Sequence, residues 1–401
     1  MTSPIASSEP MCAPQRKQRL RPPRPLAHIA RVAPYLLAGS LCACTIGKVP
    51  DKGAVVPPPE GGIDLFAISQ ATPAAALTPD EVLHCPDAQG RGATPGPLRV
   101  QFFGVATLLV TDGVNSIMVD GFLSRPSFGQ TLFAELKPDG QAIRKALARG
   151  NVRCVDAIVV SHAHFDHALD AAWIAKHGQP RATVYGSAST RMIAEGQGLK
   201  EGFEVLDVAR PIQKGAFTIQ AIPTPHSEPD YYPGIIDSEL KSPARAKEMR
   251  TGASYSFRIT HVGVGGRTST LLVVPGAPAR MEQMTELKCV DVAFLGIARL
   301  GMRDEDETEA NWRRWVSDTG AGLVIPIHWD NFWQPLGPPG QQLDPMPYPI
   351  DLVKVTTDRL GTLGAREGRG VKYLLPYSTY ELRGVNQKGQ PGCPQVQGAL
   401  K

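Results

Sequence analysis

Short apolar runs separated by turns dominate the hydrophobic pattern of the chain from residue 98 onward. Residues 100–103, 106–110 and 116–119 are such runs, and turn-forming residues at Gly104 and at Asp112-Gly113 separate them. This spacing predicts an antiparallel meander. The apolar run at 155–160 predicts a further strand, which ends at Ser161.

One apolar pattern occurs twice. CVDAIVV at 154–160 and CVDVAFL at 289–295 are closely similar, so we predict the same strand in two halves of a pseudo-symmetric domain. Helices are predicted over residues 141–148, 169–176, 187–195, 278–287, 305–318 and 349–360. Strands alternating with helices predict a mixed α/β sandwich. With 40 glycines and 37 prolines in 401 residues, the composition argues against an all-helical bundle.

The first 43 residues have the pattern of an export signal. Residues 11–31 are basic and rich in proline, and residues 32–43 form an uncharged run, far shorter than the roughly 20 apolar residues of a transmembrane helix. The run ends in Leu41-Cys42-Ala43-Cys44, which resembles a bacterial lipobox. The resemblance implies cleavage before Cys44 and lipid modification of that residue. The alternative is a plain secretory signal that contains cysteines.

The lipobox resemblance also implies a location. Thr45, rather than an acidic residue, follows Cys44, which favours the outer membrane, with the protein facing the periplasm. Residues 48–61 are rich in proline and glycine, as is typical of an extended spacer. We therefore expect a signal peptide at 1–43, a lipid anchor and linker at 44–96, a folded domain at 97–376 and a C-terminal tail at 377–401.

The excess positive charge belongs to the N-terminal segment. The formal net charge is +4, but residues 1–43 contain six lysines and arginines and one acidic residue, a surplus of five, which leaves −1 for the remainder. A nucleic-acid partner therefore lacks its electrostatic basis. An aromatic content of 6% also gives little surface for stacking on bases.

After removal of the signal peptide and acylation of Cys44, four cysteines would remain: Cys85, Cys154, Cys289 and Cys393. An oxidising periplasm permits disulfides between them. Cys85 and Cys393 lie in proline-containing segments near the two ends of the mature chain, and we prefer that pair, although the sequence does not fix the connectivity.

Three histidines and a carboxylate occupy seven residues directly after the strand predicted at 155–160. In Ser161-His162-Ala163-His164-Phe165-Asp166-His167, two histidines are two positions apart, so an extended loop directs both imidazoles to one side, as a metal ion requires. Asp166 and His167 can turn towards a second ion. The alternative is a surface histidine-rich tract, but such tracts lie in polar low-complexity sequence, whereas this one ends a core strand.

The sequence SHAHFDH resembles the HxHxDH signature of the metallo-β-lactamase superfamily. The resemblance implies further ligands after later strands, where His226 and His328 stand, and an acidic residue after the first hairpin, where Asp120 stands. It spans about residues 97–376. It implies an αββα four-layer sandwich of two mixed β-sheets flanked by helices.

The same resemblance implies two groups of metal ligands, similar to those of the class B3 metallo-β-lactamases. The first group is His162, His164 and His226, and the second is Asp166, His167 and His328. Many members add an aspartate that bridges two metals, but the matching position here is Ala277, with Asp330 as an alternative bridge. We therefore expect one or two ions. Imidazole and carboxylate ligands favour zinc, with manganese or iron as alternatives.

This ligand set implies a hydrolase. A bound metal lowers the pKa of water towards about 7 and polarises a carbonyl or phosphoryl oxygen, and Asp166 would orient the nucleophile or receive its proton. The loop at 227–252 is expected to line the pocket through Tyr231 and Tyr232, with Trp333 also in the wall and Trp329 buried. Similarity to the lactonase-like and phospholipase D-like branches implies a small-molecule or lipid-derived ester, lactone, amide or phosphodiester as substrate, at the cell envelope.

Three other histidines are assigned structural roles: His84, His177 and His261. The acidic run at 304–307 is assigned to a solvated helix start. Two other functional classes stay open, a mononuclear iron enzyme that oxidises sulfur compounds and a non-catalytic surface lipoprotein that binds a ligand. The identity and number of bound metal ions discriminate between these two classes and the hydrolase.

Overall fold

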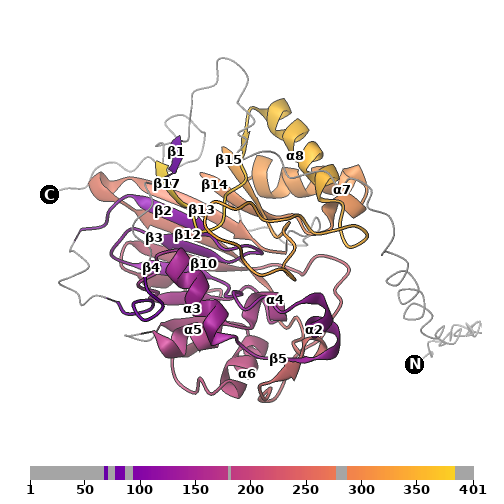
Figure 1. Ribbon diagram of the computed structural model, residues 1–401. Coiled ribbons are helices and arrows are strands. Elements are labelled where there is room, and N and C mark those ends of the chain that lie inside the picture. The colour runs from indigo at the N-terminus through magenta and orange to yellow at the C-terminus, as the bar shows by residue number, and fades with distance from the viewer. Residues whose placement is uncertain (1–66, 71–76, 86–93, 179–181, 277–286, 384–401) are drawn as a thin grey trace, which may run out of the picture. The chain divides into compact units, whose positions relative to one another are not determined.

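Two large sheets carry the strands expected from the hydrophobic pattern (Figure 1). The computed structural model describes residues 67–70, 77–85, 94–178, 182–276 and 287–383, all within the structural unit Ile46–Lys401. The expected signal peptide, Cys44 and most of the linker lie outside the described residues, as does nearly all of the helix expected at 278–287.

Each large sheet is antiparallel at one side and parallel at the other. Among the described residues, the first sheet has the order β1 (Ala67–Gln70), β17 (Thr379–Arg383), β2 (Leu98–Phe102), β3 (Leu108–Thr111), β4 (Ser116–Val119), β6 (Ala157–Val159), β7 (Thr183–Gly186) and β8 (Phe203–Val205). The second has the order β16 (Gly370–Val371), β15 (Leu323–Ile327), β14 (Val292–Gly296), β13 (Thr268–Val274), β12 (Tyr255–Val262), β10 (Phe217–Pro223) and β9 (Ile212–Lys214). A small sheet pairs β11 (Ala244–Arg245) with β5 (Glu135–Leu136).

The predicted meander is present, and both sheets are mixed. β2, β3 and β4 form the expected antiparallel meander, and β4, β6, β7 and β8 continue the sheet in parallel. In the second sheet, the strands from β9 to β13 are antiparallel and those from β13 to β16 are parallel.

The two sheets repeat one local arrangement, as the duplicated apolar pattern predicts. Asp156, just before β6, accepts the backbone N–H of Ser116 at the start of β4 (2.8 Å). Asp291, just before β14, accepts the N–H of Thr270 in β13 (2.7 Å). In both cases the residues that follow pair in parallel. The two Cys-Val-Asp segments therefore begin equivalent strands of the two sheets.

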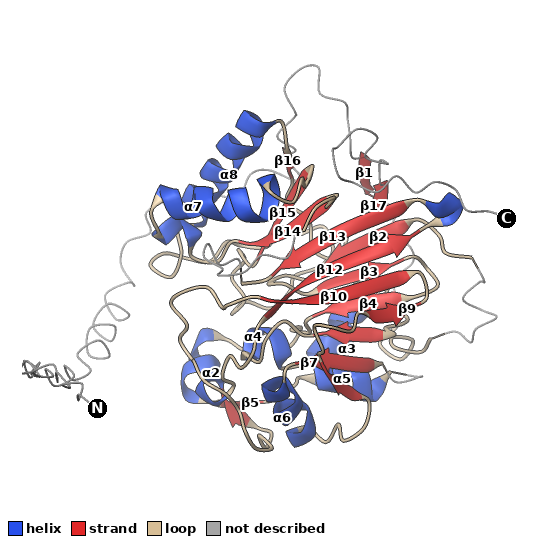
Figure 2. Cartoon of the chain, turned by 180° about the vertical axis from the view of Figure 1, so that it is seen from behind, coloured by secondary structure: helices blue, strands red, loops and turns tan. Residues whose placement is uncertain are grey.

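Helices flank the two sheets. The α-helices of the described residues are α2 (Phe128–Phe133), α3 (Gly140–Arg149), α4 (Phe165–Ala168), α5 (Ala171–His177), α6 (Ala188–Gly196), α7 (Glu305–Trp312) and α8 (Val353–Glu367). Short helical segments are η3 (Ala246–Glu248), η4 (Val264–Gly266), η5 (Leu300–Met302) and η6 (Arg313–Ser317). Helices α7 and α8 lie beside β14 and β15, whereas α5 and α6 lie beside β7 (Figure 2). Two mixed sheets flanked by helices are the predicted αββα arrangement.

The first sheet extends beyond the expected domain limits of 97–376. β17 pairs with β2, and β1 pairs with β17, both antiparallel. Part of the segment expected as a tail at 377–401, and part of the expected linker, therefore belong to the folded domain. β1 has only four residues and lies at the sheet edge, with β17 between it and β2, so the sequence pattern of β1 is weak.

The expected pairing of Cys85 with Cys393 is wrong. Cys85 forms a disulfide with Cys154, with Cα atoms 4.6 Å apart, and Cys289 is likewise disulfide-bonded. The backbone N–H of Leu83 donates to the carbonyl of Val152 (3.4 Å), so the segment at 77–85 lies alongside the chain that leads into β6. That contact brings the two sulfur atoms together.

None of the described helices has both the length and the apolar character needed to cross a bilayer.

Candidate metal centre

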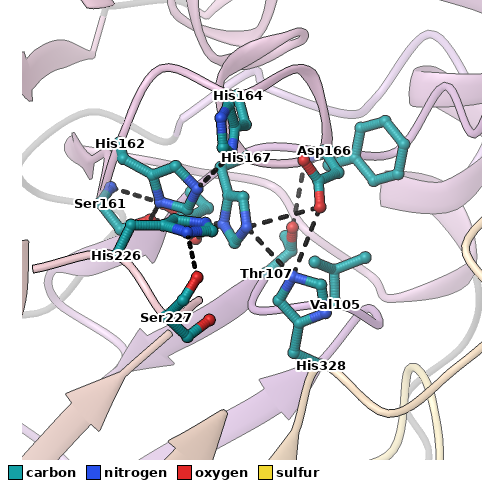
Figure 3. Close-up of polar contacts among 12 residues, drawn as sticks. Val105, Thr107, Ser161, His162, His164, Asp166, His167, His226, Ser227 and His328 are labelled. Atoms are coloured by element: carbon teal, nitrogen blue, oxygen red, sulfur yellow. Dashed lines mark hydrogen bonds and ion pairs between the residues drawn. The ribbon is translucent and has the colours of Figure 1, made fainter. Parts of the chain in front are cut away.

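Loops after three strands bring the six predicted ligands together (Figure 3). His162 and His164 follow β6, Asp166 and His167 lie in α4, His226 follows β10 and His328 follows β15. All residues of β6 and β15 are buried. The core therefore fixes the ends of both strands, and with them the loops that carry the ligands.

The ligands form two separate clusters, which we call group one and group two. Group one is His162, His164 and His226, and group two is Asp166, His167 and His328; in each group the ligand atoms lie within 4.8 Å of one another. In group one, Nε2 of His162 is 3.1 Å from Nδ1 of His164. In group two, Nε2 of His328 is 3.2 Å from Nε2 of His167 and 3.3 Å from Oδ2 of Asp166.

In group one, the imidazole nitrogens that face away from the cluster are occupied by hydrogen bonds. Nδ1–H of His226 donates to the carbonyl of Ser227 (2.7 Å). Nε2–H of His164 faces Oγ1 of Thr251 (2.9 Å) and Oδ1 of Asp230 (3.3 Å), and Thr251 in turn donates to Asp230. A ring that donates through one nitrogen presents a lone pair on the other. Both lone pairs therefore point into group one.

In group two, Asp120 fixes His167. Nδ1–H of His167 donates to Oδ2 of Asp120 (2.7 Å), while Oδ1 of Asp120 accepts the backbone N–H of Ser161 (2.7 Å). Asp120 is fully buried and has a φ of 56°, a backbone conformation that functional sites commonly impose on residues other than glycine. A carboxylate that holds the outer nitrogen of a histidine is the usual support of a metal ligand. The second nitrogen of His167 is then free to bind a cation.

The electrostatics of the clusters also suit a cation. Burial and the surrounding imidazoles hold the pKa of His162 well below its ordinary value. Burial and His164 lower the pKa of His226 to about 4. Although burial raises the pKa of Asp166, the adjacent histidines, His167 first, hold it well below its usual range. At neutral pH, His162 and His226 are therefore neutral imidazoles and Asp166 is an ionised carboxylate, which is the donor chemistry of a zinc site.

A buried ion pair positions His328. Nη1 of Arg125 lies 2.7 Å from Oδ2 of Asp330, and both side chains are at most 1% exposed. Oδ1 of Asp330 accepts the N–H of Val105, whose carbonyl accepts the N–H of His328 (2.7 and 2.6 Å). Val105 and His328 both have positive φ, 51° and 59°. The carboxylate of Asp330 is held by this network and joins neither ligand group, so the structure gives no support to Asp330 as a bridge between two metals.

The position expected for a bridging carboxylate, Ala277, lies outside the described residues. Its neighbour Gly276 lies beside His226: a Cβ on Gly276 would be 3.7 Å from the backbone nitrogen of Ser227. The end of β13 therefore does lead to the ligand clusters. Within the described part of the chain, no further carboxylate joins either group.

A cleft opens onto both ligand groups. Its lining includes Tyr231, Tyr232 and Trp333, together with Phe332 and all six ligands. Trp329 instead is 1% exposed and packs against Phe102 and Tyr373, with ring centroids 6.4 and 5.7 Å apart.

The other histidines of the described residues lie in neither group. His84 is exposed and its ring donates to the carbonyl of Asp80, while His177 stacks on Trp173. His261 is buried in β12, with Nε2 3.2 Å from Oδ2 of Asp112. The acidic run at 304–307 begins α7, as expected.

Two supporting elements were not expected from the sequence: the contacts of Asp230 and Thr251 with His164, and the pairing of Arg125 with Asp330. Asp230 follows ligand His226 by four residues, and hydrogen bonds from His164 and Thr251 lower its pKa to about 2 although burial raises it. The loop at 227–252 therefore supports a ligand as well as lining the cleft.

Comparisons with known proteins agree with this geometry. The family model of the beta-lactamase superfamily domain matches residues 117–329, a range that contains all six ligands. A search of curated proteins found no match.

The chain is also similar in structure to three solved proteins. The metallo-beta-lactamase fold protein YhfI from Bacillus subtilis is 17% identical, with 58% of this chain and 86% of that chain covered and a TM-score of 0.35. Igni18, a metallo hydrolase from the archaeon Ignicoccus hospitalis, is 13% identical (71% and 98% covered, TM-score 0.39). Yeast PDE1 is 10% identical (71% and 99% covered, TM-score 0.41). The family match supports a metal-dependent hydrolase in general terms. Because the matched segment makes up more than half of the sequence, the chain belongs to the beta-lactamase superfamily.

Proposed function

We propose that the chain is a hydrolase that holds a divalent ion in each ligand group, zinc by the chemistry of the donors, and cleaves an ester, lactone, amide or phosphodiester bond. The observation that carries this proposal is the set of outward hydrogen bonds that leaves lone pairs directed into two clusters, both open to one cleft. Most of these donors are buried, and burying polar atoms is costly unless they are paired, as a cation would pair them.

The residues at the site have distinct roles in the proposed hydrolysis. A divalent cation held there lowers the pKa of water and polarises the carbonyl or phosphoryl oxygen of the substrate. Asp166, ionised at neutral pH, orients the attacking nucleophile or receives its proton. The ring of Phe332 packs edge-on against His328, with centroids 5.9 Å apart, and limits the access of bulk water to group two.

Group two argues against the two other functional classes. A mononuclear iron enzyme would need only the residues of group one, yet Asp166, His167 and His328 converge within 3.6 Å of one another. A surface lipoprotein that only binds a ligand would need neither group.

A panel of chromogenic substrates tests the proposal. We expect zinc-loaded protein to hydrolyse at least one of a p-nitrophenyl ester, a lactone, a p-nitroanilide and bis(p-nitrophenyl) phosphate. Treatment with 1,10-phenanthroline should abolish this activity, and added zinc should restore it. Protein that carries two zinc ions and cleaves none of these bonds would contradict the proposal.

We further propose that the enzyme acts at the cell envelope, tethered through a lipidated Cys44 and facing the periplasm. The support is the lipobox-like sequence and the spacer that follows it. Wild-type protein should sediment with membranes, and Cys44→Ala should appear in the soluble fraction or stay unprocessed. An unmodified N-terminus at another residue, found by mass spectrometry, would refute the tether.

A further inference from the structure

One wall of the cleft is apolar. Leu132 from α2 and the side chains of Phe332, Trp333, Met346 and Ile350 line it. Rings of this wall hold one another in place, since Phe332 and Trp333 have centroids 4.9 Å apart and Trp333 packs edge-on against Phe128 at 4.7 Å. Met346 is 5% exposed, and the N–H of Met346 donates to the carbonyl of Trp329. This wall is packed against the core before any ligand arrives.

The apolar surface continues out to the mouth of the cleft. Leu132, which lines the cleft, is 41% exposed. Tyr231, which also lines the cleft, is 59% exposed. Exposed apolar side chains that adjoin a site commonly mark where an apolar ligand binds. A small polar substrate would gain nothing from this surface.

Arg299 contributes the one positively charged side chain among the described residues of the lining. Asp351 fixes its backbone, because Oδ2 of Asp351 accepts the N–H of Arg299 (2.7 Å). The guanidinium donates a single hydrogen bond to the described residues, from Nη1 to the carbonyl of Ile350 (3.2 Å), and Nε has no partner. The ring of Tyr231 lies 5.5 Å from the guanidinium carbon.

The guanidinium therefore keeps unused donors next to the ligand clusters. Among the described residues, no carboxylate forms a close ion pair with Arg299; Asp351 binds its backbone N–H and interacts with its charge only at longer range. Of the acidic side chains in the lining, Asp166 belongs to group two, the carboxylate of Asp351 accepts two backbone N–H groups, and Glu228 is exposed. Guanidinium donors left free in a cleft suit a phosphate or carboxylate oxygen.

We propose that the substrate is an amphiphilic anion, with an alkyl, acyl or aromatic group on the apolar wall and a phosphate or carboxylate held by Arg299. This inference rests on the proposed hydrolase function and names the substrate class of the same site. The apolar wall and Arg299 would contact different parts of one substrate molecule. Their contributions to binding can therefore be measured separately.

Three probes test this separation in zinc-loaded protein, with binding measured by calorimetry below the micelle concentration: octyl phosphate, inorganic phosphate and octyl glucoside. Arg299→Gln should weaken binding of octyl phosphate and of inorganic phosphate by about tenfold or more and leave octyl glucoside unchanged. Met346→Ala should weaken both octyl probes by about tenfold and leave inorganic phosphate unchanged.

Two further variants serve as controls. Arg299→Lys keeps the charge and should recover part of the phosphate affinity. Arg366→Gln removes an exposed arginine that pairs with Glu309 outside the cleft, and it should change no affinity.

Equal weakening of all three probes by Arg299→Gln, or no weakening of any, would overturn the inference. The inference also fails if wild-type protein binds octyl phosphate no more tightly than inorganic phosphate. Because these measurements need no turnover, their failure alongside zinc-dependent hydrolysis would refute the substrate class alone. Probe binding as expected, without hydrolysis of any substrate, would instead refute the proposed reaction.

Discussion

Replacing His162 with alanine is expected to remove the metal ion from group one and to lower hydrolysis by about a thousandfold or more. His162 is fully buried and is one of the three ligands that the described residues supply to that group. An ion left with two ligands binds weakly, and its loss removes several kcal/mol of transition-state stabilisation. Metal analysis of the purified variant, together with its rate on the substrate that wild-type protein cleaves, measures both effects.

Two other histidines provide matched controls. His84→Ala and His177→Ala also remove an imidazole, but neither ring lies in a ligand group. Both variants should retain wild-type metal content and rate. If His162→Ala keeps its full metal content, the assignment of group one is wrong.

Breaking the buried ion pair should have the largest effect on stability. Asp330→Ala leaves the guanidinium of Arg125 buried without its partner, which costs about 3–5 kcal/mol of the free energy of unfolding. It also frees the N–H of Val105, whose carbonyl holds His328. We therefore expect weaker metal binding in group two as well as a lower midpoint in urea denaturation.

The double variant separates charge from packing. Arg125→Met combined with Asp330→Leu removes both charges, so it should be more stable than Asp330→Ala alone. A side chain at position 104 would disturb the same network. Gly104 has a φ of +86°, and a Cβ there would be 1.7 Å from Nη2 of Arg125. Exposed ion pairs contribute less than about 1 kcal/mol to the free energy of unfolding. If Asp330→Ala lowers that free energy by no more than this, the ion pair does not hold this part of the fold.

Those parts of the fold that local sequence determines could be predicted. The meander and the repeated Cys-Val-Asp strands follow from short apolar runs, and their pairing is as expected. The motif from Ser161 to His167 places four ligands within seven residues, so its chemistry is visible without any knowledge of tertiary contacts. His226 and His328 needed the family resemblance.

Contacts between distant residues could not be predicted. Arg125 and Asp330 are 205 positions apart, and Thr251 lies 87 positions after His164. A lone arginine, aspartate or threonine in a loop carries no pattern that names its partner. The disulfide of Cys85 and Cys154 was missed for the same reason, because it depends on how the segment at 77–85 lies against the chain before β6.

The metal content of full-length protein purified without added metal tests the central claim most directly. Two ligand groups with imidazole and carboxylate donors predict close to two zinc ions per chain, measured by inductively coupled plasma mass spectrometry. For His162→Ala they predict about one. A single iron per chain, or no metal in a folded protein even after incubation with zinc, would contradict a hydrolase that depends on both groups.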